Sequence, residues 1–369
     1  MPPRPRLIAH DIYRRSSYGG RHPLAIARVS AALDLIRAMG WLEEDQYVVS
    51  PEASLDELGR FHAPDYLAAL QAAERSQRAD PETRRRYNFG VNGNPVFPEM
   101  FRRPATSCGG TLKGAELLLA DGGIVHHLAG GTHHGRRDRA SGFCYLNDVA
   151  LGILRLLDGG LRRVLYVDLD AHHGDGVEAA FAGDGRVLTI SIHEEGRWPY
   201  SGALTDRAGG SARNLPVPAG FNDSELAALI EGAVLPLAER FGPEAVVVQC
   251  GADALADDPM SDGMLSNGAL WSAVLRIAQS APRLLILGGG GYNPWSVARC
   301  WAGLWAALNG RAPDQVPTAT ARAVLRELTW SRSQGRNPPE HWFTTIADPG
   351  RPNTVRSRIH ELVAVSLAP

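Results

Sequence analysis

The sequence predicts a three-layer αβα fold in which a central, mostly parallel sheet lies between two layers of helices. Four apolar, β-branched runs have the length and composition of buried strands: Val164–Val167, Val187–Ile192, Ala245–Gln249 and Leu284–Leu287. They alternate with segments of helical periodicity, which is typical of parallel α/β sheets. Polar motifs follow the strands, at the edge where such sheets carry their chemistry.

Seven segments show helical periodicity, with apolar residues three and four positions apart. They are Pro23–Met39, Pro64–Ala73, Ser107–Ala120, Asp148–Leu157, Ser224–Phe241, Ser266–Gln279 and Trp295–Leu308. Ser54 and Glu57 have the spacing of a capping box, and Ser224 and Ser266 are candidate N-caps. A further short helix is expected at Val177–Ala182.

We expect residues 1–369 to form a single domain, because large α/β sheets often use chains of this length as one unit. The motifs end before Gly310, so about residues 311–369 are expected to pack on that domain as a C-terminal extension. Tyr87–Pro104 is too long for an ordinary connection and is predicted to be a functional rim loop. Ser331–Pro339 is polar and is predicted to wrap the surface.

The composition argues against several classes of partner. The chain has 38 Lys and Arg against 40 Asp and Glu, so no positive excess favours a nucleic acid or an anionic membrane. No apolar run reaches about eighteen residues, the length that crosses a bilayer. The four cysteines contain no Cys-x-x-Cys pair, and Cys250 and Cys300 are expected to be buried free thiols, which suits the cytoplasm.

A dense group of ionisable residues follows the strand Val164–Val167. It contains Asp168, Asp170, His172, His173 and Asp175. If extended geometry continues through Ala171, Asp168, Asp170 and His172 project on one side. Burying this much charge is costly without a partner, and carboxylate with imidazole can bind one divalent metal. The pattern therefore predicts a metal site.

Four further blocks occur in a fixed order around this group. They are GGTHHG at Gly130–Gly135, SGFCYLND at Ser141–Asp148, QCGADALADDPM at Gln249–Met260 and GGGGYN at Gly288–Asn293. Together the blocks resemble the histone deacetylase superfamily, which includes bacterial acetoin-utilization-type deacetylases and acetylpolyamine amidohydrolases. The resemblance runs from about His10 to Trp305 and implies an arginase/deacetylase-like fold.

The resemblance implies that Asp170, His172 and Asp258 bind the catalytic metal. Three protein ligands leave room for water and a substrate carbonyl, as in catalytic zinc sites. Zn²⁺ is expected, and the oxygen-rich set also suits Fe²⁺, Co²⁺ or Mn²⁺. Asp257 is expected to face solvent, and Asp253 to be a buried carboxylate behind the ligands.

Catalytic roles follow from the same resemblance. His134 is expected to take a proton from the metal-activated water and later protonate the leaving amine, while His133 acts electrostatically. Asp168 would support His133 and Asp175 would support His134, each on the far ring nitrogen. Tyr292 would donate a hydrogen bond to the tetrahedral oxyanion.

Other residues are assigned to substrate and product by the resemblance. Phe143 is expected to form one wall of an apolar channel for the acyl-amine stem, and Trp198 is a candidate opposite wall. Gly290, in the glycine loop, is expected to let the backbone approach the substrate. Arg28 resembles an arginine that lines an acetate exit path. An aromatic of the core and an arginine on a helix surface are the alternatives for Trp198 and Arg28.

A structural K⁺ site is also implied beside the metal-bearing strand. Its residues would be Asp168, Asp170, His172, Ser191 and Ile192. Two other groups are interpreted as structural. His126 and His127 lie in an apolar run without a metal motif, and Arg136–Arg139 is more consistent with a solvated loop than with a contact to an acidic substrate.

The sequence thus predicts a zinc-dependent amidohydrolase that removes acetyl, or a similar short acyl group, from acetyl-lysine in protein or from a small acetylated amine. An arginase-type binuclear manganese ureohydrolase and a non-catalytic acyl-lysine binding module are the rivals. The number of metal ions bound per chain would distinguish the ureohydrolase, and a turnover assay would distinguish the binding module. Val91–Asn94 carries no acid to grip a peptide or polyamine, so the substrate stays open, as does the choice between monomer and homo-oligomer.

Overall fold

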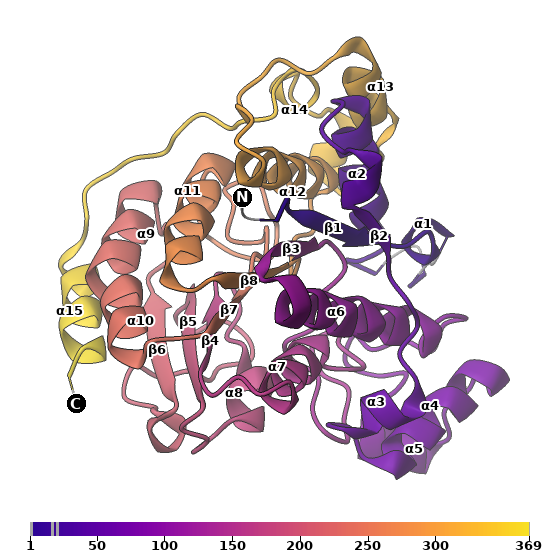
Figure 1. The fold of residues 1–369 in the computed structure, drawn as a ribbon. Coiled ribbons are helices and arrows are strands. Elements are labelled where there is room, and N and C mark those ends of the chain that lie inside the picture. Colours follow the sequence, from indigo (N-terminus) through magenta and orange to yellow (C-terminus); the bar gives the residue numbers. More distant parts are fainter. Residues whose placement is uncertain (1–2, 16–17, 20–21, 369) are drawn as a thin grey trace.

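The computed structural model describes residues 3–15, 18–19 and 22–368, and its central feature is one eight-stranded sheet (Figure 1). The strand order is β2-β1-β3-β8-β7-β4-β5-β6, and every neighbouring pair is parallel. The strands are β1 (Arg6–Ala9), β2 (Tyr47–Val49), β3 (Gly123–His127), β4 (Val164–Asp168), β5 (Val187–Glu194), β6 (Ala212–Val217), β7 (Ala245–Gln249) and β8 (Arg283–Leu287).

Helices cover both faces of the sheet, which confirms the predicted αβα layers. One face carries α6 (Arg102–Asp121), α7 (Asp148–Asp158) and α8 (Asp175–Ala180). The other carries α2 (Val29–Ala38), α9 (Asp223–Leu229), α10 (Leu235–Phe241), α11 (Asn267–Ile277) and α12 (Pro294–Leu308). Strand β4 shows why both layers form: Leu165 and Val167 pack into one core, and Val164 and Tyr166 into the other, because successive strand residues face opposite sides.

The remaining helices lie outside these layers. Helices α3 (Leu55–Gly59), α4 (Pro64–Ser76) and α5 (Pro81–Tyr87) form a satellite core with the loop before α6, and α1 spans Ile12–Arg15. The C-terminal extension contains α13 (Ala319–Glu327), α14 (His341–Thr344) and α15 (Ser357–Ser366). In Figure 1, α13 lies beside α2 and α15 lies beside the edge strand β6. Residues 331–339 run mostly exposed over the surface, as expected.

The sequence missed four strands, β1, β2, β3 and β6. Three of them are five residues or shorter, and β3 carries two buried histidines. Strand β6 contains an arginine, an asparagine and Pro216, and a proline is tolerated there because β6 is an edge strand.

Two helix predictions also need correction. The helix expected from Pro23 begins at Val29, because Arg28 leaves helical geometry at the N-cap and sends its side chain to the carbonyl of Gly289. The helix expected at Ser224–Phe241 is broken by a π-helical turn, Ile230–Val234, before Pro236, which cannot donate a helical hydrogen bond.

The predicted caps gave mixed results. Asn222, not Ser224, caps α9. Ser266 caps α11 and Ser54 forms its capping box with Glu57, as predicted. Among the described residues, no helix has the length and apolar character needed to cross a membrane.

Candidate active site

Two predicted metal residues, Asp170 and His172, follow β4, and the third, Asp258, follows the neighbouring strand β7 at the same end of the sheet (Figure 1). Strand β4 stops at Asp168, so the extended geometry expected through Ala171 is wrong. The N–H of Asp170 donates to Oδ1 of Asp168 (3.1 Å), and the N–H of His172 donates to Oδ1 of Asp170 (3.0 Å). These side chain-to-backbone turns, rather than strand alternation, gather the three side chains.

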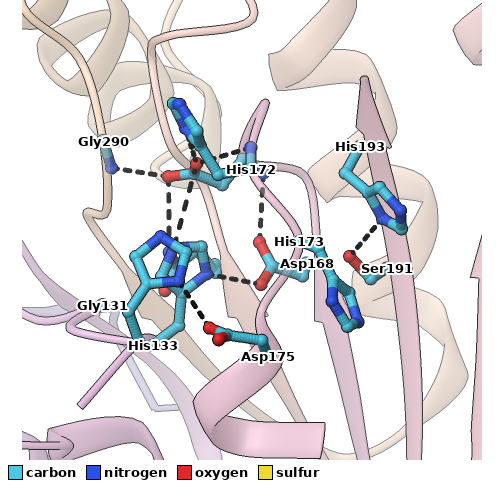
Figure 2. A network of polar contacts seen from close by, with 12 residues as sticks. Gly131, His133, Asp168, His172, His173, Asp175, Ser191, His193 and Gly290 are labelled. Carbon is cyan, nitrogen blue, oxygen red and sulfur yellow. Dashed lines mark hydrogen bonds and ion pairs between the residues drawn. The ribbon is translucent and has the colours of Figure 1, made fainter. Parts of the chain in front are cut away.

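Each histidine of the adjacent pair lies against a carboxylate (Figure 2). Nδ1 of His133 is 2.7 Å from Oδ2 of Asp168, and Nδ1 of His134 is 2.7 Å from Oδ1 of Asp175. This is the pairing that the motif implied. The two ring centroids are 3.9 Å apart, and Nε2 of His133 lies 3.9 Å from Oδ1 of Asp170. A carboxylate on Nδ1 fixes the orientation and tautomer of each ring, which leaves Nε2 for chemistry.

The two rings differ in charge. Burial disfavours charge on His133, but the carboxylates of Asp168 and Asp170 outweigh it and raise its pKa to about 9. Burial, together with the positive charge of His133, lowers the pKa of His134 to about 3 despite Asp175. At neutral pH His133 is therefore protonated, whereas His134 has a free nitrogen that can accept a proton.

His172 lies between two carboxylates. Its Nδ1 is 3.1 Å from Oδ1 of Asp170 and 2.9 Å from Oδ2 of Asp253. One ligand atom from each of the three buried residues lies within 4.8 Å of the others. Asp253, placed behind the ligands by the sequence analysis, is thus part of this cluster.

Asp258 is the adjoining carboxylate. Its Oδ2 accepts a hydrogen bond from the N–H of Tyr292 (2.5 Å), and its Oδ1 accepts one from the N–H of Met260 (3.0 Å). Burial and the negative charge of Asp253 raise the pKa of Asp258 to about 7. The site therefore concentrates negative charge on the side that faces His172.

The glycine loop after β8 approaches this cluster closely. The N–H of Gly290 donates to Oδ2 of Asp170 (2.7 Å), and its carbonyl accepts from the N–H of Ala252 (2.9 Å). A Cβ at position 290 would lie only 2.1 Å from Oδ2 of Asp253, so no side chain fits there. This backbone serves to hold Asp170, and a contact of Gly290 with substrate stays a prediction.

A cavity of about 90 Å³ adjoins these groups, and its lining includes His133, His134, Asp170, His172, Phe143 and Tyr292. The Phe143 ring lies 6.1 Å from that of Tyr292, and the Phe143 N–H donates to Oδ1 of Asn94 in the rim loop (3.0 Å). Trp198 is 38% exposed, and its ring lies 4.6 Å from that of His134. Both aromatics therefore stand at the site rather than in the core.

Arg28 lines the same cavity and is not a helix-surface residue. Its guanidinium donates to the carbonyl of Gly289 and lies 5.2 Å from the ring of Trp301. The Nε of Arg28 is buried and has no hydrogen-bond partner among the described residues. Such a group can meet an anion that passes through the cavity.

The candidate K⁺ residues lie on adjacent strands. Asp168 on β4 pairs with Ser191 on β5, and Ile192 follows. Oγ of Ser191 is 2.9 Å from Nδ1 of the buried His193, as Figure 2 shows. The assignment of a cation here stays a prediction.

Two histidines interpreted as structural are buried in β3. Burial lowers the pKa of both His126 and His127 to about 3, and Nδ1 of His127 lies 3.0 Å from Oγ1 of Thr111. They remain neutral core residues, as expected.

Arg136 and Asp257 differ from the expectation of solvated side chains. Arg136 donates to both the carboxylate and the carbonyl of Asp175, and so fixes the partner of His134. Asp257 is half-buried and accepts a hydrogen bond from the indole of Trp342.

The sequence analysis missed the role of Asp148. Its buried carboxylate accepts hydrogen bonds from the N–H groups of Gly131 and Thr132 and from the hydroxyls of Thr111 and Thr132. Asp148 therefore holds the loop that leads into the histidine pair. In the sequence, Asp148 is the last residue of the SGFCYLND block and the first residue of the predicted helix Asp148–Leu157.

Comparison with known proteins decides the family. The family model of the histone deacetylase domain matches residues 22–308. The chain belongs to the histone deacetylase family. Histone deacetylase 8 of Xenopus tropicalis is 40% identical over 292 residues, which cover 77% of this chain and 78% of that protein. Human histone deacetylase 1 is 34% identical over 308 residues, 81% of this chain and 64% of that protein.

Solved structures agree with the sequence relatives. The crystal structure of a histone deacetylase homologue from Aquifex aeolicus matches with a TM-score of 0.93 and 34% identity, and the match covers 99% of this chain and 100% of that chain. A complex of a histone deacetylase homologue with SAHA matches equally well, with a TM-score of 0.93. The fold is thus that of the deacetylases, and the chain is a metal-dependent deacetylase, a hydrolase with an Asp-His-Asp group suited to the metal.

Proposed function

We propose that this deacetylase removes acetyl or a similar short acyl group from an amine, with one Zn²⁺ held by Asp170, His172 and Asp258. The observation that carries the proposal is the histidine pair, in which each Nδ1 is bound to a carboxylate and a charged ring adjoins a neutral one beside the metal cluster. An acid–base catalyst needs a ring that is neutral at working pH.

The donor set fits a divalent ion. Three buried carboxylates, Asp170, Asp253 and Asp258, lie around one imidazole, and buried negative charge of this kind is unfavourable without a cation. Nitrogen and oxygen donors suit Zn²⁺, and Fe²⁺, Co²⁺ and Mn²⁺ accept the same set. We assign Asp258 rather than Asp253 as the third ligand, because Asp258 occupies the ligand position of the family motif. Its carboxylate also accepts a hydrogen bond from the N–H of Tyr292.

When bound, the ion would polarise the acyl carbonyl and lower the pKa of water in the site. His134 takes a proton from the attacking water and returns it to the leaving nitrogen. His133 stays protonated and stabilises the negative charge that develops on oxygen. Burial raises the pKa of Tyr292 well above its usual value, so its hydroxyl keeps the proton that it donates to the carbonyl oxygen.

The walls of the cavity define the substrate class. Phe143 lines the cavity, and Trp198 lies against His134. These two aromatics would hold the acyl-amine stem, and Gly290 lines the cavity next to Asp170. Arg28 lies where it would guide the released carboxylate. The matching homologue in complex with SAHA supports a site that accepts an acylated-amine-like molecule.

Acetyl-lysine in protein and a small acetylated amine both meet these requirements. We further propose a structural K⁺ at Asp168, Asp170, His172, Ser191 and Ile192, where β4 and β5 lie side by side.

The free, buried state of all four cysteines supports a reducing compartment, the cytoplasm.

Acetate release tests the proposal. The metal-loaded protein is incubated with acetyl-lysine peptides and acetylated polyamines, and free acetate is measured. We expect turnover with one divalent ion per chain, and its loss in His134→Ala. Binding without turnover would instead indicate an acyl-lysine binding module.

A further inference from the structure

The C-terminal extension lies beyond residues 22–308, the part that the family model matches. It nevertheless reaches the proposed metal site. The side chain of Trp342, on α14, is 3% exposed, and its Nε1 donates to Oδ2 of Asp257 at 3.0 Å. Asp257 immediately precedes the proposed ligand Asp258.

Asp257 is held from two directions. Trp342 holds its carboxylate, and Nδ2 of Asn293 donates to its main-chain carbonyl at 3.0 Å. Asn293 follows Tyr292, whose N–H donates to Oδ2 of Asp258. Residues 257 and 258 are therefore hydrogen-bonded to residues 292 and 293. The indole of Trp342 adds a hydrogen bond to this group from the C-terminal extension.

The indole itself is fixed by packing. It stacks on Trp295 at the start of α12, with centroids 5.0 Å apart and an interplanar angle of 25°. Trp295 is 1% exposed, and its own Nε1 donates to the carbonyl of Leu325 on α13 (2.8 Å). Trp330 completes the cluster at 6.4 Å from Trp342. The N–H of Trp342 is thus aimed at Asp257 by a rigid aromatic group.

Asp257 directly precedes the proposed ligand Asp258 in the chain, so a movement of Asp257 would also move the backbone of Asp258. We propose that Trp342 is a positioning residue for the catalytic metal. By holding the carboxylate of Asp257, it fixes the backbone from which the side chain of the proposed ligand Asp258 extends. Hydrogen bonds just outside the ligands commonly change metal affinity 10–100-fold. The inference rests on the proposed function, because it requires Asp258 to be a ligand.

The test compares four variants of the full chain with the wild type. Trp342→Phe removes the N–H donor and keeps an aromatic ring for stacking. Trp330→Phe is the matched control, because it alters the same cluster and leaves the Trp342–Asp257 hydrogen bond in place. Asp257→Ala removes the acceptor, and the double variant Trp342→Phe/Asp257→Ala measures the coupling of the two groups. The readouts are the Zn²⁺ dissociation constant from chelator competition, the visible spectrum of the Co²⁺-loaded protein and the melting temperature of the metal-free protein.

We expect Trp342→Phe to weaken Zn²⁺ binding about 10-fold and to change the Co²⁺ spectrum, while Trp330→Phe changes neither. If the indole acts only by restraining Asp257, adding Trp342→Phe to Asp257→Ala should change Zn²⁺ affinity no further. Equal Zn²⁺ affinity in Trp342→Phe and Trp330→Phe, at equal melting temperatures, would overturn the inference. So would additive effects in the double variant.

Asp258→Ala separates this inference from the proposed function. If Asp258→Ala keeps the wild-type Zn²⁺ affinity, the ligand assignment fails and the inference falls with it. If Asp258→Ala loses Zn²⁺ and Trp342→Phe does not, the positioning role alone is wrong.

Discussion

His133 and His134 are neighbours in the sequence, yet their pKa values move in opposite directions. Both rings are buried and both contact a carboxylate, so neither burial nor pairing alone separates them. The difference arises because His133 also feels Asp170, whereas His134 feels the positive charge of His133. In the proposed mechanism, His133 therefore has the electrostatic role and His134 transfers the proton.

This asymmetry predicts the pH dependence of the reaction. The pKa of His133 is raised from 6.5 to about 9, so its positive charge is present at neutral pH and is lost as the pH rises through about 9. We expect kcat/KM to fall on the alkaline side with an apparent pKa near 9. The pH profile of His133→Gln should lack this limb, and an unchanged alkaline limb in that variant would remove His133 from the assignment.

In the proposed mechanism, the hydroxyl of Tyr292 contributes only where the oxyanion develops. Tyr292→Phe should therefore lower kcat by about two to three orders of magnitude with little change in KM. Steady-state kinetics measures both constants, and Tyr13→Phe in the same cavity is the control. A wild-type kcat in Tyr292→Phe would show that another donor serves the oxyanion.

At the scale of elements, the segment Val91–Asn94 of the rim loop before α6 carries no acid. Asn92 is exposed, and its backbone has a φ of +49°, a conformation that aspartate also tolerates. Asn92→Asp should favour cationic acetylpolyamines modestly, because an exposed charge is screened by salt. The measurement is kcat/KM over peptides and acetylpolyamines for both proteins. A strong wild-type preference for one cationic acetylpolyamine would mean that the gripping carboxylate lies elsewhere.

The segment before α15 is held by an ion pair between the buried Glu225 and the partly exposed Arg356. Both carboxylate oxygens of Glu225, which is 0% exposed, accept hydrogen bonds from Arg356 at 2.6 Å. Arg356→Ala would leave a buried carboxylate with fewer donors and should lower the free energy of unfolding by about 2 kcal/mol. Arg358→Ala, which breaks more exposed pairs, should cost less than about 1 kcal/mol. Urea unfolding of the two variants tests this, and equal losses would contradict it.

The same pair has a pH signature. Burial opposes ionisation of Glu225, but the hydrogen bonds from Arg356 outweigh it and lower the pKa. Its stabilisation is therefore present above the usual glutamate pKa and is lost as the pH falls through the lowered value. The difference between wild type and Arg356→Ala should shrink in acid.

The elements that the sequence predicted are those with an unambiguous pattern. The runs around β4, β5, β7 and β8 are buried on both faces, so their apolar composition identifies them. Strand β6 was missed because pairing with β5, rather than its own composition, makes it a strand. The start of α2 was misplaced because the contact of Arg28 with Gly289 joins residues far apart in the sequence.

The residues of the candidate site also fall into a predicted group and a group that the sequence did not reveal. Motifs predicted that His133, His134, Asp170, His172 and Tyr292 lie together, because these residues belong to short sequence blocks whose spacing is local. Contacts across the fold were not visible: Arg136 on Asp175, and Trp342 on Asp257. A residue that acts through a partner 85 positions away leaves no spacing in the sequence to detect.

At the scale of the whole molecule, the parallel strands place the residues of the candidate site at one end of the sheet, where their carboxyl ends meet. The ends of β4, β7 and β8 supply the carboxylates, His172 and Tyr292, while the loop after β3 supplies the histidine pair. Helices on both faces exclude water beneath this edge, so its charges interact strongly. Under the proposed function, this buried set of residues binds a single divalent ion and hydrolyses an acylated amine.

The most direct measurement is a metal titration of the metal-free chain, with acetate release from an acetyl-lysine peptide as the signal. Activity should rise linearly with added Zn²⁺ and reach its plateau at about one ion per chain, and Asp258→Ala should show neither tight binding nor turnover while remaining folded. A requirement for two tightly bound Mn²⁺ per chain, or metal binding without acetate release, would contradict the account.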